Sequence, residues 1–401
     1  MTENFNPFLT EYHTPFGTTP FHLIKTEHFE PAMEEGMKAH NRDVDAIVNN
    51  SDEPTFANTI VALEKSGVLL DRVTTVFGNL LSAETSDELE VLAERMMPRL
   101  SEHSNNISLN ERLFARIKQV YDETKQGALS QEDYMLLQNT YNSFIRNGAN
   151  LTLEQKERFR QLSAELSVLT LKFSQNNLKE TNRYELLLTP EQTDGLPTSA
   201  LDAYAQAAKD KNQEGYLVTL QAPSFVPFMK YSSHRELRKQ LYMAYNTQCT
   251  HDDEFNNLEI VQKLVNLRLE RAQLLGYSTV ADYVLSKRMA ENSDNVYKLL
   301  NELLDAYKPT AHQEVEDVKT LAKELEGEDF ELMPWDWAYY SEKLKEKKFN
   351  LNEEELRPYF ELKKVIQGVF GLATRLYGIT FQENPNIPVY HPDVKAYEVK
   401  D

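Results

Sequence analysis

Nine histidines are present in the chain, and none of them has the spacing of a helical zinc motif. In a His-Glu-x-x-His helix the two histidines lie one turn apart and bind the metal from one face, while the glutamate acts on the bound water. No two histidines here are four positions apart. The nearest approach is AHQEVED, where His312 is followed by Glu314 and Glu316, and we interpret this run as a solvated helix surface.

A second group of potential metal ligands is the run CTHDDEF at residues 249–255. A helix start is the simpler interpretation, because acidic side chains are stabilised near the positive end of the helix dipole. The sequence has no G-x-S-x-G nucleophile motif and no phosphate-binding loop. Paired carboxylates are too frequent in so acidic a chain for any one pair to be assigned to glycoside hydrolysis.

The run MPWDWAYYSEKL at residues 333–344 contains both tryptophans of the chain and a tyrosine pair. We predict that this run is helical, which would place Asp336, Tyr339 and Tyr340 on one side. One hypothesis is that Trp335, Asp336, Tyr339 and Tyr340 line a substrate cleft, because amphipathic aromatic side chains can grip a peptide. The alternative is that these side chains pack in the core.

Helices must position these residues, because helical patterning dominates the sequence after an extended arm at residues 1–31. Thr152 and Gln155 predict a capping box, in which each side chain accepts a hydrogen bond from the other residue's backbone N–H. Ser233 and Glu236 predict a second capping box. The apolar stripe that follows the first box has the three- and four-residue spacing of a helix face. Its members are Phe159, Leu162, Leu166, Leu169 and Phe173.

The run SDNVYKLLNELLDAYKP predicts another amphipathic helix, which we expect to end at Pro309 because proline disrupts a helix interior. Its apolar face comprises Val296, Leu299, Leu300, Leu303, Leu304 and Tyr307. Strand patterns are fewer. RYELLLTP, GYLVTLQAP and the final DVKAYEVKD are the candidates, and TDGLPTSA at residues 193–200 is the clearest internal loop.

Composition narrows the class of protein. The 401 residues suffice for two domains, and 43 basic against 63 acidic residues give a net charge of −20. Such a charge disfavours nucleic acid and anionic membranes as partners. The single cysteine, Cys249, excludes an internal disulfide framework and suits a reducing compartment. We see no signal peptide and no apolar run of about 20 residues, so we expect a cytoplasmic protein.

The aromatic run and the residues after it, WDWAYYSEKLKEKKFNLNEEELRPYFELKKVIQGVFGLATRLYGITF, resemble a distinctive region of the thimet oligopeptidase family of zinc metallopeptidases. PFHLIKTEHFEPAMEEGM and LLGYSTVADYVLSKRMAENSDNVYKLL resemble other segments of that family in the same order. Oligopeptidase A, neurolysin and bacterial dipeptidyl carboxypeptidase belong to it, and the resemblance is greatest to the dipeptidyl carboxypeptidase branch.

The resemblance implies a mainly α, multi-helix, two-lobed architecture like that of neurolysin, with a small β element. It implies a helical region with the arm at 1–228 and the beginning of a peptidase domain at 229–401. It also implies a channel for short unstructured peptides, a zinc-activated water, and release of C-terminal dipeptides or, alternatively, internal cleavage.

In the family, the His-Glu-x-x-His helix follows the strand that DVKAYEVKD resembles, so no catalytic or metal residue can be assigned in this chain. We expect zinc only in the complete enzyme and none bound by this portion. The chain would be the N-terminal part of the enzyme, inactive alone, with an apolar face for the missing C-terminal catalytic portion. The alternative is a short, non-catalytic helical protein that binds peptides or a partner.

Overall fold

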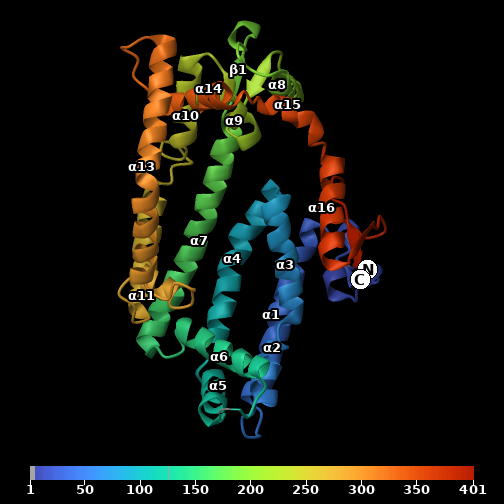
Figure 1. The fold of residues 1–401 in the computed structure, drawn as a ribbon. Coiled ribbons are helices and arrows are strands. Elements are labelled where there is room, and N and C mark those ends of the chain that lie inside the picture. The colour runs from blue at the N-terminus through green and yellow to red at the C-terminus, as the bar shows by residue number, and fades with distance from the viewer. Residues whose placement is uncertain (1–4, 126) are drawn as a thin grey trace. The chain divides into compact units, whose positions relative to one another are not determined.

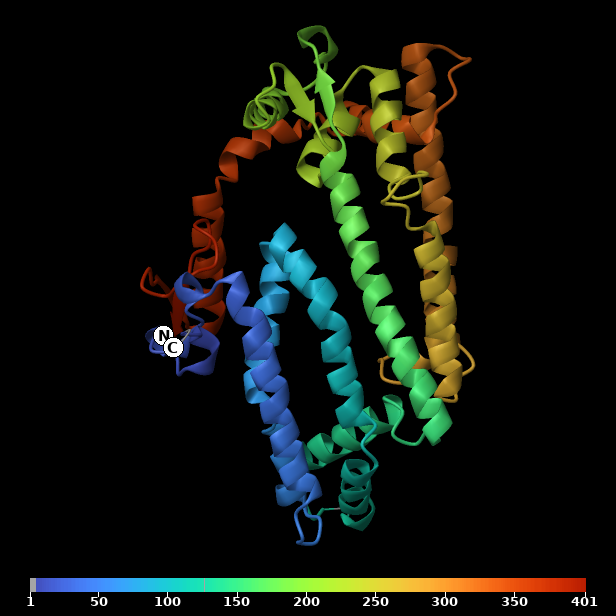
Figure 2. The same ribbon diagram turned by 180° about the vertical axis from the view of Figure 1, so that it is seen from behind.

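The structure, a computed structural model, describes residues 5–125 and 127–401. These residues are mainly helical, as expected, and include two small antiparallel sheets (Figures 1 and 2). The chain divides into two compact units that alternate along the sequence. Unit 1 comprises the described residues of Met1–Leu171, with Leu264–Thr279 and Val369–Asp401, and unit 2 comprises Lys172–Lys263 and Val280–Gly368. The domain division predicted at residue 228 lies inside unit 2 and stays a prediction.

Unit 1 holds the first helices of the chain, of which α1, α3 and α4 lie side by side (Figures 1 and 2). Its helices are α1 (Thr26–Val48), α2 (Ala62–Glu64), α3 (Val68–Ala83), α4 (Asp87–Ser108), α5 (Glu111–Glu123) and α6 (Gln131–Arg146), with a π-helical turn at Phe56–Val61. Its strands β3 (Thr380–Glu383) and β4 (Tyr397–Lys400) pair antiparallel, with Phe381 opposite Val399. The predicted strand at the end of the sequence is thereby confirmed.

A glycine lets α1 and α3 pack closely. A Cβ added to Gly36 would lie only 2.9 Å from the backbone Cα of Leu70, so a larger residue would push the helices apart. The adjoining core takes in Phe8 of the N-terminal arm, which is fully buried with its ring centroid 5.0 Å from that of Phe29. The arm is therefore anchored by its aromatic side chains. The arm was predicted to begin at residue 1, and residues 1–4 lie outside the part of the chain that the structure describes.

Two histidines are in contact inside unit 1. Nδ1 of His40 on α1 lies 3.0 Å from Nε2 of His103 on α4, at hydrogen-bond distance. Burial lowers the pKa of both imidazoles, and for His103 the neighbouring His40 adds to this effect. One ring must donate and the other accept, which requires at least one neutral imidazole. Protonation of both rings would therefore break this contact between α1 and α4.

Unit 2 surrounds a two-stranded sheet in which Leu187 of β1 lies opposite Leu217 of β2. Both strands were predicted from the sequence, and both are confirmed. The elements of unit 2 are β1 (Leu186–Leu188), α8 (Thr198–Asp210), β2 (Tyr216–Val218), α9 (Ala222–Tyr231), α10 (Arg235–Asn246), α12 (Val280–Leu285), α13 (Ser293–Glu326), α14 (Trp337–Phe349) and α15 (Glu353–Leu356). Its core includes Leu188, Tyr204, Val218, Phe228 and Leu241.

Helix α13 passes straight through Pro309, so the predicted end of the helix is wrong. The proline removes one backbone hydrogen bond, but tertiary packing of Val318 and Ala322 holds the second half of the helix. The predicted apolar face of the first half is present and uncovered. Leu300 is 52% exposed and Leu304 is 56% exposed. Figure 1 shows this helix in orange, extending well beyond α14.

Three further helices include residues of both units: α7 (Leu153–Arg183), α11 (Leu258–Leu274) and α16 (Leu362–Tyr377). The predicted capping box of α7 is confirmed, because the N–H of Thr152 donates to Oε1 of Gln155 at 3.0 Å and the N–H of Gln155 donates to Oγ1 of Thr152 at 3.3 Å. The second predicted box is wrong, because the hydroxyl of Ser233 donates to Asp194 (2.6 Å) instead of capping α10. In the part of the chain that the structure describes, no helix has the length and apolarity to cross a membrane.

Candidate functional site

The tryptophan segment begins with a tight turn instead of the predicted helix. Pro334–Asp336 form a 3₁₀ turn, and α14 follows directly at Trp337. A proline suits the start of the turn because its φ is already helical and its missing N–H is not needed there. The N–H of Met333 donates to Oδ2 of Asp336 at 3.1 Å and closes the turn. Trp335 and Asp336 therefore precede the α-helix.

Asp336 is fully buried and paired with two arginines of α10. Nη2 of Arg235 donates to its Oδ2 at 2.7 Å, and Nη2 of Arg238 donates to its Oδ1 at 2.9 Å. Arg238 is 1% exposed and also donates from Nη1 to the carbonyl oxygen of Ser232 at 2.7 Å. Buried charges are tolerated where partners and hydrogen bonds replace water. This cluster fixes the tryptophan segment to α10.

Two opposing effects set the pKa of Asp336. Burial favours the neutral acid, but hydrogen bonds from Arg235, the Met333 backbone and Arg238 favour the carboxylate and hold the pKa of Asp336 below its ordinary value. The ring centroid of Tyr339 lies 4.1 Å from Cζ of Arg238, a cation–π contact that adds to the cluster. Asp336 is therefore an ionised anchor inside the folded unit.

The other members of the predicted cleft differ in exposure. Tyr340 is 2% exposed, and its hydroxyl donates to Oε1 of Glu326 at 2.9 Å. Burial, together with that glutamate, raises the pKa of the Tyr340 hydroxyl. Trp335 is half-buried against the core around β1 and β2. Burial favours the core-packing alternative for Asp336 and Tyr340, while peptide contact by Trp335 or Tyr339 stays a prediction.

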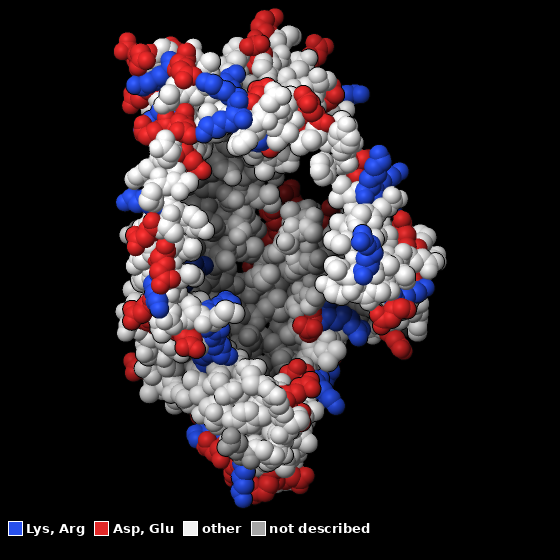
Figure 3. All heavy atoms as spheres, viewed as in Figure 1, with Lys and Arg blue, Asp and Glu red and all other residues white. Residues whose placement is uncertain are grey.

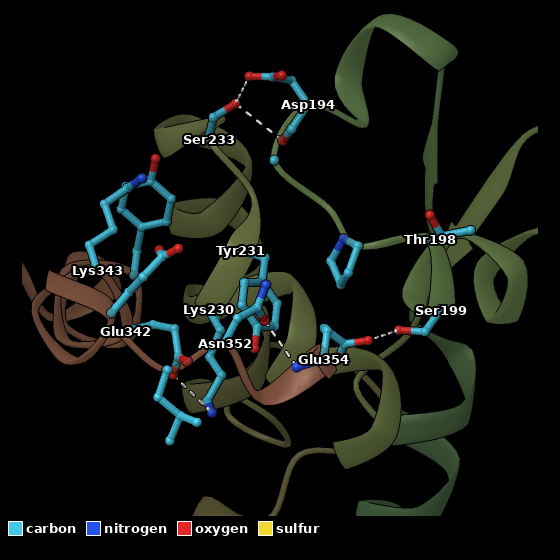
Figure 4. A pocket seen from close by; sticks show the side chains of 15 residues that line it. Asp194, Thr198, Ser199, Lys230, Tyr231, Ser233, Glu342, Lys343, Asn352 and Glu354 are labelled. Atoms are coloured by element: carbon cyan, nitrogen blue, oxygen red, sulfur yellow. Dashed lines mark hydrogen bonds and ion pairs between the residues drawn. The ribbon is translucent and has the colours of Figure 1, made fainter. Parts of the chain in front are cut away.

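Tyr339 lines a pocket of about 750 Å³ in unit 2, which we call the α8–α14 pocket (Figure 4). Its walls come from the loop before α8, the start of α8, the end of α9, one side of α14 and the residues at α15. A Cβ on Gly195, whose φ is +83°, would lie 2.3 Å from the carbonyl oxygen of Tyr231, so this loop position requires glycine. Other lining side chains are Ser199, Lys230, Glu342, Lys343 and Glu354.

Ion pairs organise the pocket. Nζ of Lys230 lies 3.2 Å from Oε2 of Glu342 and 3.1 Å from Oε2 of Glu353. Burial opposes the charge on Lys230, but the two glutamates outweigh this effect and raise the pKa of the ammonium. The hydroxyl of Ser199 donates to Oε2 of Glu354 at 2.6 Å, a bond drawn in Figure 4. Donors, acceptors and two tyrosines suit binding of a polar ligand. The described lining residues include no histidine or cysteine to act as a base or nucleophile.

Neither run of potential metal ligands forms a site. His312 lies on the exposed part of α13, as expected. The CTHDDEF run lies in a loop and α11 begins only at Leu258, so the predicted helix start is wrong; Arg183 of α7 instead holds Asp253 at 2.7 Å. Across residues 5–125 and 127–401, no three His, Cys, Asp or Glu side chains are grouped to hold a metal ion. These residues therefore do not fit the zinc ion that the resemblance implies.

No local pattern in the sequence links Asp336 to the arginines that bind it. Arg235 and Arg238 are three positions apart, which places them on one helix face and could have indicated a shared partner. That partner lies 101 and 98 positions further along the chain, outside any local pattern. The contact between Ser199 and Glu354 spans 155 positions and is equally inaccessible to pattern analysis.

Comparison with known proteins relates the whole chain to peptidases. The profile of Peptidase family M3 matches residues 228–401. The dipeptidyl carboxypeptidase of Escherichia coli (strain K12) is 34% identical over 399 residues, which cover 99% of this chain and 58% of that protein. Oligopeptidase A of the same strain is 33% identical over 401 residues, with the same coverage. Organellar oligopeptidase A of Arabidopsis thaliana is 32% identical over 409 residues, covering 99% and 50%. The chain thus spans between half and three fifths of the length of these relatives.

Proposed function

Because residues 228–401 of this chain belong to peptidase family M3, as the resemblance implied, we propose that the chain is the N-terminal portion of a zinc-dependent metallopeptidase acting on short peptides. Similarity to dipeptidyl carboxypeptidase and oligopeptidase A along 99% of the chain carries this proposal. M3 metallopeptidases are zinc-dependent in general. In our proposal the zinc ligands and the general base come from a further part of the peptidase, since the described residues offer no metal site.

The first test uses the purified 401-residue chain. We expect it to contain no stoichiometric zinc and to leave short peptides intact in the presence of added zinc. Metal analysis and mass spectrometry of the peptides measure both quantities. Zinc-dependent hydrolysis that a chelator abolishes would contradict this proposal, because the chain would then have a complete site of its own.

For the reaction we propose release of C-terminal dipeptides, because the relative at 34% identity is named for that activity. Internal cleavage is the second candidate, favoured by the 33% identity to oligopeptidase A. The complete peptidase, assembled from this chain and the part that supplies zinc ligands, can be given one peptide with a free carboxyl terminus and the same peptide amidated. Dipeptides formed only from the free peptide are expected. Equal internal cleavage of both peptides would overturn dipeptide release.

Uncovered apolar faces support a partner for this portion. The first half of α13 carries one such face, and α16 carries another in which five residues follow a three- and four-residue spacing. The members on α16 are Leu362, Val365, Val369, Leu372 and Leu376, which are 71%, 39%, 58%, 56% and 64% exposed. Contiguous apolar surface of this kind marks an interaction site. We propose that the remaining part of the M3 peptidase covers these apolar faces, because the match accounts for only 58% of the length of the E. coli dipeptidyl carboxypeptidase.

Solution behaviour tests this assignment. The isolated chain should bind an apolar dye such as ANS and self-associate in sedimentation experiments, and both effects should disappear when the complementary part of the peptidase is added. A compact monomer without dye binding would instead favour a non-catalytic, partner-binding protein.

We further propose that Tyr339 contacts peptide in the complete enzyme, since its ring lines the α8–α14 pocket. Tyr339→Phe should raise KM if the hydroxyl binds substrate. Tyr340→Phe is the matched control, because its hydroxyl is bound internally to Glu326, and it should lower stability without changing KM. Unchanged kinetics and unchanged stability of Tyr339→Phe would refute the contact.

We propose a cytoplasmic location and no nucleic-acid partner, both from composition. The single cysteine suits a reducing compartment, and the net charge of −20 opposes contact with phosphate backbones. Figure 3 shows acidic and basic side chains intermixed on the face drawn. Binding of the purified chain to duplex DNA at low salt would contradict the second proposal.

A further inference from the structure

Residues 350–361, which we call the strap, follow α14 and have little apolar attachment. The strap begins at Asn350, whose φ of +48° ends α14, and contains α15 and a 3₁₀ turn at Arg357–Tyr359. Its large apolar side chains face solvent: Tyr359 is 77% exposed and Phe360 is 68% exposed. Hydrophobic burial therefore does little to hold this segment in place.

Two adjacent carboxylates attach the strap to the rest of unit 2. Glu353 pairs with Lys230 of α9 at 3.1 Å and also with Lys345 of α14. Glu354 accepts a hydrogen bond of 2.6 Å from the hydroxyl of Ser199, the second residue of α8. All three contacts are polar, and Glu353 is 46% exposed at its side chain. Such contacts are weakened by salt and by competing water.

Lys230 and Lys345 also contact Glu342, which is not part of the strap and would remain paired with them if the strap detached. Oε2 of Glu342 lies 3.2 Å from Nζ of Lys230, and its Oε1 lies 3.4 Å from Nζ of Lys345. Glu342 belongs to α14, and its side chain is only 12% exposed. Detachment of Glu353 therefore leaves neither ammonium without a carboxylate. This removes the main cost of opening a partly buried ion pair, which is an unpaired charge.

The strap also forms one wall of the α8–α14 pocket, through Leu351, Asn352 and Glu354 (Figure 4). We propose that the strap is an ionic closure of this pocket, which pivots at Asn350 and opens when the contacts of Glu353 and Glu354 are screened or broken. Opening widens the pocket, frees the hydroxyl of Ser199 for a ligand, and leaves Lys230 paired with Glu342 alone. Ionic strength, or an anionic ligand that competes for these groups, then sets how much of the protein is open.

Limited proteolysis of the whole chain tests this closure. Chymotrypsin cuts after Tyr359 or Phe360 only when the strap is released from its supports, so the cleavage rate follows the open population. The rate for the unaltered chain should rise between about 0.05 M and about 0.5 M NaCl. Glu353→Gln should be cut roughly two to five times faster at the lower salt and should lose most of the salt dependence. Cleavage of an unfolded peptide corrects for the effect of salt on the protease.

Glu324→Gln is the matched control. It breaks the exposed 2.5 Å ion pair between Glu324 of α13 and Lys347 of α14, and neither residue contacts the strap. Its cleavage rate should equal that of the unaltered chain. The proposal would be overturned if Glu353→Gln were cleaved at the same rate as the unaltered chain, or if both variants were cleaved faster by the same factor. A cleavage rate of the unaltered chain that does not change with salt would also overturn it. Hydrogen exchange confined to residues 350–361 gives an independent readout of the same opening.

Discussion

Replacement of Asp336 by asparagine should destabilise unit 2 by about 3–5 kcal/mol. The magnitude follows from the unequal positions of its two arginines. The side chain of Arg235 is 38% exposed and can turn toward water, but that of Arg238 is 1% exposed and would keep a buried charge without a counterion. In addition, the side-chain NH2 of asparagine is a hydrogen-bond donor, and it would face the N–H donors of the guanidinium groups without an acceptor between them. Loss of one partner from a buried ion pair has this cost in other proteins.

Urea denaturation followed by tryptophan fluorescence measures the free energy of unfolding of unit 2, because both tryptophans belong to that unit. Asp317→Asn is the control, since Asp317 forms an exposed pair with Lys348 at 2.5 Å and its loss should matter much less. The double variant Arg238→Met with Asp336→Leu should recover part of the stability. An effect of Asp336→Asn no larger than that of the control would refute the reasoning.

Acid titration adds a second observable for the same residue. The folded pKa of Asp336 lies below its ordinary value, whereas an unfolded aspartate titrates near pH 3.9. The unfolded chain therefore binds the proton first as pH falls. The stabilisation is complete above the unfolded pKa and is lost as pH drops through the folded pKa. Asp336→Asn should show a shallower loss of stability in this acid range.

The remaining predictions concern unit 1. The pKa values of His40 and His103 are lowered in the folded state, so the unfolded chain binds more protons below about pH 6.5. The free energy of unfolding should fall as pH drops through that range, and His103→Gln should flatten the dependence measured by circular dichroism. Gly36→Ala should destabilise the unit by about 1–3 kcal/mol despite the better helix propensity of alanine, because its Cβ would meet the α3 backbone at 2.9 Å; a rise in melting temperature would contradict this. Phe8→Ala should cost about 3–5 kcal/mol, whereas Leu9→Ala, at a position 47% exposed, should have little effect, and equal losses would show that the arm is not anchored by Phe8.

Local chemistry made much of the fold predictable. The capping box at Thr152 needs only residues three positions apart, and the strands around Leu187 and Leu217 have short β-rich patterns between turn residues. The errors arose where distant groups compete. Asp194 binds the hydroxyl of Ser233 that was expected to cap a helix, and packing around Val318 carries α13 past its proline.

The candidate site was less predictable than the helices. The run at residues 333–344 was recognisable from its aromatic content, but the burial of Asp336 depends on arginines about a hundred positions away. Tyr339 and Tyr340 are adjacent in sequence and point to different surroundings, one at a pocket and one in a core. Helical periodicity separates two such neighbours by about 100°, and only the tertiary neighbours decide which side is covered.

The segments of unit 1 are far apart in the sequence, and this affects when the unit can be completed during synthesis on the ribosome. Its last segment begins at Val369, and the edge contact between Phe21 and Tyr390, with ring centroids 5.6 Å apart, joins the two ends of the sequence. Nearly 200 residues separate Leu171 from that last segment. At about 5–20 residues per second, the ribosome needs roughly 10–40 s to make them. Throughout that interval the first helices of unit 1 have been made but the segment that contacts Phe21 has not, so unit 1 can be completed only after most of unit 2 has been synthesised.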